Sequence, residues 1–268
     1  GLSDHLVAGE WDAFDERATA ALELLDRQRG ETPEGTRSGA DGPTGLSADL
    51  HRLVRDRYVL AGREHLASAR PRLEAGDLEL SYRRARTAYD NFERALERAR
   101  RTGLQSKTAM VGLTMADDIA DTSLGRLLAR GREHRASASA CETPEDRIDH
   151  LETAFEIYGT VEALMTGDET LSDRVRERTG EASAAVTTAL VESRLEAAGN
   201  HRQTADWEPT GRGDEAAREA AETARTHMEG ALELATSYQP GDAAEIRARL
   251  DSLRSAFGTV GADRDSGA

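Results

Sequence analysis

The stretch GREHLASA, at Gly62–Ala69, returns 69 residues later as GREHRASA, at Gly131–Ala138. The two copies differ only at Leu66, whose counterpart is Arg135. Similarity of a chain to itself at one fixed offset is typical of a repeated supersecondary unit. The stretch therefore predicts that the chain builds one kind of structural unit more than once.

The repeat extends well beyond the quoted letters. Without a gap, the same offset pairs Ala85 with Ala154, Tyr89 with Tyr158, Phe92 with Val161 and Glu93 with Glu162. A fainter third copy places His201 136 residues after His65, and there ALERA at Ala95–Ala99 meets ALELA at Ala231–Ala235. Apolar residues in these segments recur at helical spacing. We therefore predict a repeated helical hairpin of about 68 residues.

Helix breakers give the limits of the hairpins. The predicted units are Ser47–Arg101, Gln105–Thr166 and Leu171–Ser237. Breaks within them are predicted at Ala75–Asp77, Glu142–Pro144 and Trp207–Gly213, where Gly and Pro residues interrupt the pattern. Thr143 followed by Pro144 is a strong helix start. Pro71 lies inside a helical pattern, so we expect it to kink or end that helix.

The fold class that follows is all-α, a stack or elongated bundle of about three long antiparallel helical hairpins with flanking helices. No run of alternating β-branched residues predicts a strand. The expected organisation is an N-terminal helical segment at 1–29, a linker or loop at 30–46, the hairpin repeat domain at 47–258 and a disordered tail at 259–268. The first segment carries an apolar stripe at Leu6, Trp11, Phe14, Ala18, Leu22 and Leu25.

The segment EAGDLELSYRRARTA, at Glu74–Ala88, resembles the turn and second helix of a tetratricopeptide repeat. Gly76, Asp77, Ser81, Ala85 and Ala88 carry the resemblance. The first helix of the hairpin is longer than in that family and lacks its early aromatic residue. The resemblance implies stacked hairpins that bury a shared apolar face and bind proteins.

Charge is the most unusual feature of the composition. The chain has 50 acidic and 35 basic residues, for a net charge of −15, and Lys107 is its only lysine. This balance resembles proteins of organisms with molar intracellular salt, haloarchaea above all. At about 1 M salt the Debye length falls to roughly 3 Å, which screens the self-repulsion of such a surface. We expect a salt-adapted cytoplasmic protein.

Several functional classes are disfavoured. Basic residues are interleaved with acids, so no stripe suits nucleic acid. No apolar run approaches 18 residues, so a membrane partner is not expected. Cys141 is the only cysteine, which rules out an intrachain disulfide. His134 lies seven residues before it, but no orienting third group can be assigned to make the thiol a nucleophile.

One motif suggests chemistry. Asp117-Asp118-x-x-Asp121 resembles the first aspartate-rich region of isoprenyl diphosphate synthases, which implies magnesium ligands for a diphosphate. The chain has no second such motif and no Gly-Gly-Lys, both of which those enzymes use. Acid-rich chains also form this string by chance. We interpret the three aspartates as a solvated helix face and keep the metal site as the alternative.

The repeated histidines are the second set of candidates. His65, His134 and His201 lie on or beside the apolar stripe of each first helix. Recurrence at matching positions favours a packing role, and any further role is left open. The ligand spacings Glu-x-x-His and His-x-x-x-His are absent. We therefore assign no metal site and expect no cofactor.

The function predicted from these observations is a non-enzymatic interaction or scaffold protein with an unidentified protein partner. A homo-oligomer is left open. No residue is assigned to catalysis. The alternative is a magnesium-dependent helical enzyme acting on a prenyl or other diphosphate through Asp117, Asp118 and Asp121.

Overall fold

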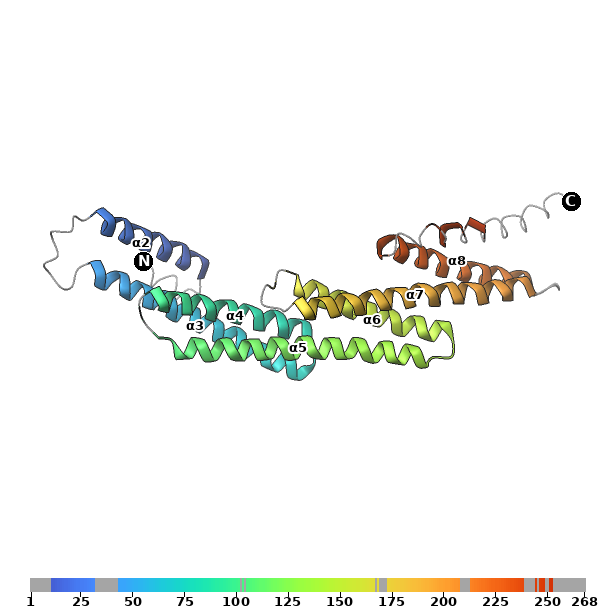
Figure 1. The fold of residues 1–268 in the computed structure, drawn as a ribbon, viewed down its shortest axis with the longest axis horizontal. Coiled ribbons are helices and arrows are strands. Elements are labelled where there is room, and N and C mark those ends of the chain that lie inside the picture. Colours follow the sequence, from blue (N-terminus) through green and yellow to red (C-terminus); the bar gives the residue numbers. More distant parts are fainter. Residues whose placement is uncertain are drawn as a thin grey trace. The chain divides into compact units, whose positions relative to one another are not determined.

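The computed structural model describes residues 11–31, 43–101, 103, 105–166, 168, 173–207, 213–238, 244, 246–248 and 251–252. Its regular structure in these ranges is entirely α-helical, which confirms the all-α class. The helices are α2 (Trp11–Glu31), α3 (Pro43–Ala75), α4 (Leu78–Arg101), α5 (Lys107–Ala140), α6 (Pro144–Met165), α7 (Asp173–Trp207) and α8 (Gly213–Tyr238), labelled in Figure 1.

The predicted breaks separate the observed helices. Gly76 joins α3 to α4 with a φ of 79°, a left-handed conformation that glycine adopts without steric cost. Thr143 caps α6, and its side chain accepts a hydrogen bond from the backbone N–H of Asp146, with Pro144 at the helix start. α3 packs on α4 and α7 packs on α8, as two of the predicted hairpins require, and α5 meets α6 at Gly131 and Tyr158.

The predicted loop at 30–46 is too long at both ends. α2 continues to Glu31, and α3 begins at Pro43 rather than at Ser47. Proline suits the first turn of a helix because the N–H that it lacks would have no intrahelical acceptor there. Within α3, the helix continues through Pro71 and ends at Ala75.

Some expectations concern parts of the chain that are not described. Residues 1–10, with Leu6, the loop core 32–42 and the predicted tail 259–268 lie outside the described residues. So do the side chains of Trp11 and Leu25. The other residues of the N-terminal stripe, Phe14, Ala18 and Leu22, are buried as predicted.

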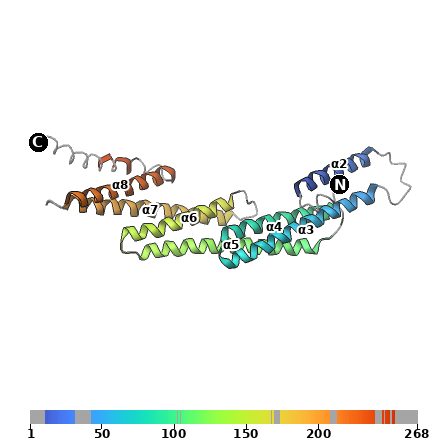
Figure 2. The ribbon, with the colours of Figure 1, turned by 180° about the vertical axis from the view of Figure 1, so that it is seen from behind.

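The chain forms two compact units, Gly1–Leu124 and Gly125–Ala268, with the boundary inside α5. In the first unit, α3, α4 and the beginning of α5 lie side by side in both views (Figures 1 and 2), and α2 packs on α3. In the second, α7 packs against both α6 and α8. The single repeat domain at 47–258 stays a prediction.

One part of the core of the first unit packs two glycines against an aromatic ring. Phe92 of α4 is buried between Gly62 of α3 and Gly112 of α5. A Cβ on Gly62 would lie 2.8 Å from the ring, and a Cβ on Gly112 would lie 2.4 Å from it. The same buried cluster contains Ala88, Ala95, Ala109 and Ala116 of α4 and α5, together with larger side chains such as Phe14, Leu50 and Tyr58. The two glycines therefore leave room for the Phe92 ring between α3 and α5.

Two buried hydroxyls link three helices of the same unit. Ser81 of α4 donates to the backbone oxygen of Ala69 on α3 at 3.1 Å. Ser123 of α5 lies 3.0 Å from the Ser81 hydroxyl and 2.8 Å from the backbone oxygen of Ile119. Both serines are fully buried, so each polar atom finds a partner inside the core.

The second unit has two apolar clusters, one on each side of α7. The first joins α7 to α5 and α6 through Val186, Leu190, Ala138, Leu151 and Tyr158. The second joins α7 to α8 through Val191, Ala198, Ala224, Met228 and Ala231. Within the described ranges, no helix combines the length and the apolar character needed to cross a bilayer.

Candidate functional site

The aspartate motif lies on α5 in the first unit. Asp118 and Asp121 are exposed and Asp117 is half-exposed, whereas Ile119 and Leu124 on the other face are buried. Asp117 forms an ion pair of 3.5 Å with Arg86 of α4. The helix therefore presents its acids to solvent, as its apolar pattern predicted, and one of them is held by an arginine.

The three aspartates do not gather into a metal-binding group. Among the described residues, one group of three or more His, Cys, Asp and Glu side chains lies close enough to hold an ion, and it contains none of these aspartates. A diphosphate clamp needs several oxygen ligands around one magnesium ion. The geometry of this face of α5 supplies no support for the clamp.

The repeated histidines are all half-buried and all contact a second helix. Nδ1 of His65 lies 3.3 Å from Nη1 of Arg84 on α4. Nδ1 of His134 lies 3.3 Å from Nδ1 of His150 on α6. His201 contacts a carboxylate and a further histidine. Each of the three histidines thus contacts a neighbouring helix, but the contacted group differs from one histidine to the next. That they superpose as equivalent sites stays a prediction.

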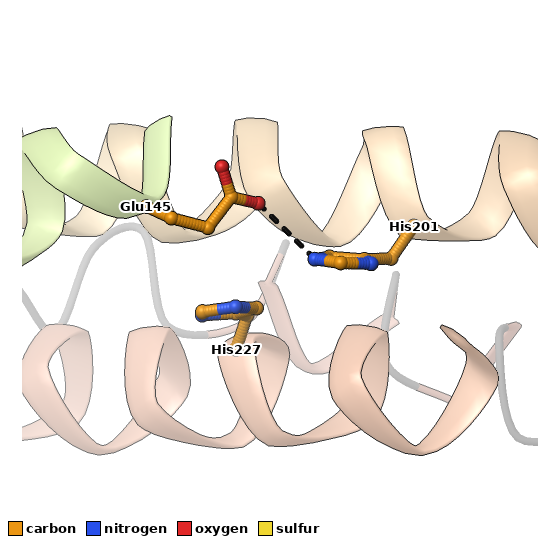
Figure 3. A group of neighbouring side chains, drawn as sticks. All are labelled: Glu145, His201 and His227. Carbon is orange, nitrogen blue, oxygen red and sulfur yellow. Dashed lines mark hydrogen bonds and ion pairs between the residues drawn. The ribbon is translucent and has the colours of Figure 1, made fainter. Parts of the chain in front are cut away.

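The third histidine belongs to a cluster that we call the α6–α8 triad, made of Glu145, His201 and His227 (Figure 3). Glu145 comes from the start of α6, His201 from the C-terminal part of α7 and His227 from the middle of α8. Nε2 of His201 lies 3.1 Å from Oε1 of Glu145. The two imidazole rings stack with centroids 5.8 Å apart and an interplanar angle of 15°.

The surroundings of His227 disfavour its protonated form. Burial lowers the pKa of His227, the charges of Arg194 and His201 lower it further, and Glu145 and Glu152 oppose these effects. Arg194 itself pairs with Glu152 of α6. Burial also lowers the pKa of His65, with a smaller contribution from Arg84 and an opposing one from Glu64.

The sequence did not identify the triad. Neither Glu145 nor His227 was a candidate. The three residues lie on three helices, and 56 residues separate Glu145 from His201. No local spacing motif could have revealed the cluster, because the contact depends on how α8 packs against α7.

A separate surface feature lies in the first unit, and we call it the α3–α5 pocket. It has a volume of about 410 Å³ and lies between residues 55–63 of α3 and Gln105–Thr108, the segment that leads into α5. Three cations line it, Arg55, Arg63 and Lys107, against the single acid Asp56. This is an unusual balance for a chain whose net charge is −15.

Large apolar side chains are exposed on the pocket wall and on the helix turn that follows it. Leu60 in the wall is 52% exposed. Met110 and Val111, just after the pocket residues of α5, are each 59% exposed. Exposed apolar groups beside a recess are typical of a surface that contacts another molecule.

Comparisons of the chain with protein-family models, curated proteins and solved structures found no match.

Proposed function

We propose that this chain is a non-enzymatic protein-protein interaction or scaffold protein of a salt-adapted cytoplasm. The binding surface that we assign is the α3–α5 pocket together with Leu60, Met110 and Val111. The observation that carries the proposal is the concentration of cations and exposed apolar groups at one place on an acidic chain.

The charges of the pocket suit a partner segment that carries carboxylates. Asp56 is engaged with Arg55 at 2.7 Å, so it does not neutralise the other two cations. Arg63 and Lys107 have no ion-pair partner within the part of the chain that the structure describes. An acidic group of a partner could therefore pair with either cation without displacing an internal contact.

The apolar groups suit a segment that is also amphipathic. Val59 and Leu60 line the recess, where an apolar side chain of the partner would be removed from water. Burial of apolar surface stabilises by about 25 cal/mol per Å². At molar salt, long-range steering is screened, so this burial and direct ion pairs would supply the affinity.

The hairpin architecture agrees with this role by analogy only. The α3–α4 hairpin has the turn and the small-residue face that resemble a tetratricopeptide repeat, and proteins of that kind present surfaces to partners. The diphosphate alternative has no comparable support, because Asp117 pairs with Arg86 and its neighbours in the motif face solvent.

Site-specific photo-crosslinking in the native cell tests the proposal. A crosslinker at Leu60 or Met110 should capture one protein through an acidic, amphipathic segment. The same crosslinker at Glu219, an exposed position on α8, is the control and should not capture it. Binding should then be measured with the purified partner in molar KCl.

In that assay, Leu60→Asp and Lys107→Glu should each weaken binding by about tenfold or more, since central apolar and charged contacts dominate interfaces. Glu219→Gln should leave binding unchanged. Equal capture from Glu219, or affinity that neither pocket substitution alters, would refute the pocket. Capture of a second copy of the chain would indicate that the pocket mediates self-association and not the binding of a different protein.

A further inference from the structure

We propose that Glu145, His201 and His227 form a binding site for a divalent first-row transition metal, with zinc as its expected occupant. Two imidazoles and one carboxylate are a ligand set that zinc uses when it keeps a fourth position open to water. The site lies in the second unit and is independent of the α3–α5 pocket.

The distances are close to those of a coordination shell. The three ligand atoms all lie within 4.8 Å of one another, and the Glu145–His201 pair is already at 3.1 Å. Zinc bonds of about 2.0–2.1 Å in tetrahedral geometry put ligand atoms roughly 3.3 Å apart. Completing the shell would require the His227 and Glu145 side chains to turn toward the ion.

His227 carries the strongest sign of a missing ligand. Its Nδ1 atom is buried, and no hydrogen-bond partner for it is present in the described part of the chain. Buried polar atoms are nearly always paired, so an unpaired one needs an explanation. Coordination of an ion would satisfy this nitrogen. The His227 ring stacks on His201, so it would have to turn out of the stack to bring its in-plane lone pair to the same ion (Figure 3).

The protonation state and the access of solvent also suit a metal. Imidazole binds metals in its neutral form, and burial lowers the pKa of His227 in this environment. The Glu145 side chain is 46% exposed and that of His201 is 30% exposed, so an ion has a path to the site. Arg194 is the nearby cation that opposes binding, and its ion pair with Glu152 offsets part of its charge.

A metal there would join three helices. Glu145 is on α6, His201 on α7 and His227 on α8, and the unfolded chain does not hold these residues together. A ligand that binds only the folded state raises its stability in proportion to the logarithm of its concentration above Kd. The expected role is therefore a clamp on the second unit.

The test is zinc titration of the full chain in molar KCl by calorimetry, with melting temperature as a second readout. One equivalent should bind and raise the melting temperature. Glu145→Gln, which keeps the side-chain length, and His227→Gln should each weaken binding by about tenfold or more. His150→Gln is the matched control, because it changes a histidine that pairs with His134 outside the triad, and it should leave zinc affinity unchanged.

A readout on the wild-type chain does not depend on the folding of variants. Zinc should slow the reaction of His201 and His227 with diethylpyrocarbonate, as mapped by mass spectrometry, and leave the rate at His65 unaltered. No stoichiometric binding would overturn the proposal. So would binding that survives His227→Gln, binding that is lost in His150→Gln, or equal protection of His65.

Discussion

The ring of Phe92 on α4 occupies the space in front of Gly112 on α5, where a Cβ would lie only 2.4 Å from it. Gly62 on α3 confines the same ring from another helix. A side chain at either glycine would therefore collide with the ring. The packing of three helices in the first unit depends on two positions that lack a side chain.

We expect Gly112→Ala to destabilise the first unit. Overpacking of a core costs roughly 1–3 kcal/mol, and the better helix propensity of alanine returns only about 1 kcal/mol. Gly159→Ala is the control, since nothing lies within 4 Å of a Cβ there, and it should raise stability. Urea unfolding of both variants measures the difference. A Gly112→Ala chain as stable as wild type would contradict this account of the core.

The buried hydroxyl pair gives a second prediction. Ser81→Ala removes the donor to Ala69 and one partner of Ser123, while Ser123 keeps the carbonyl of Ile119. The net contribution of such a hydrogen bond is about 1 kcal/mol, so we expect a loss of that order. Ser139→Ala, at an exposed serine of α5, should change the unfolding free energy far less.

Removal of the Tyr158 hydroxyl, unlike removal of the Ser81 hydroxyl, is expected to preserve or raise the stability of the fold. Its hydroxyl is buried, and no hydrogen-bond partner for it is present among the described residues. Burial also raises the pKa of this hydroxyl. Tyr158→Phe removes an unpaired polar atom, so thermal unfolding should show unchanged or higher stability, by about 1 kcal/mol at most. Tyr238→Phe, at an exposed ring, should be neutral, and a marked loss in Tyr158→Phe would reveal a hydrogen bond that the structure lacks.

Acidification should destabilise the fold partly through His65 and His227. Both have a pKa below the ordinary value of 6.5, so the unfolded chain binds more protons than the folded one between the folded pKa and 6.5. Stability therefore falls as the pH is lowered through this window and is regained above it. Denaturant melts at a series of pH values should show a smaller slope in His65→Gln than in wild type. An identical slope would remove His65 from the effect.

Salt should stabilise the whole chain. The net charge of −15 opposes compaction when it is unscreened. We expect loss of helicity or of cooperative unfolding below about 0.5 M KCl, as the Debye length grows. Circular dichroism over a KCl series measures this, and a melting temperature that does not respond to salt would contradict salt adaptation.

Local pattern was sufficient to predict the helices and where most of them end. The break at Gly76, the cap at Thr143 and the buried stripe of Phe14, Ala18 and Leu22 follow from residue types within a few positions of one another. The start of α3 at Pro43 was missed, although the same rules apply to it, because the Gly-rich composition before Ser47 suggested a loop.

Among the candidate site residues, too, some features could be predicted from one helix alone and others depended on how helices pack. The exposure of Asp118 and Asp121 could be predicted from the apolar face of their own helix. The contacts of His201 could not, because they depend on Glu145, 56 residues away, and on His227 across the packing of α7 on α8. Helical periodicity determines which face of one helix is buried. Only tertiary packing sets the axial register between helices, and that register decided both the fit of Phe92 on Gly112 and the meeting of the triad.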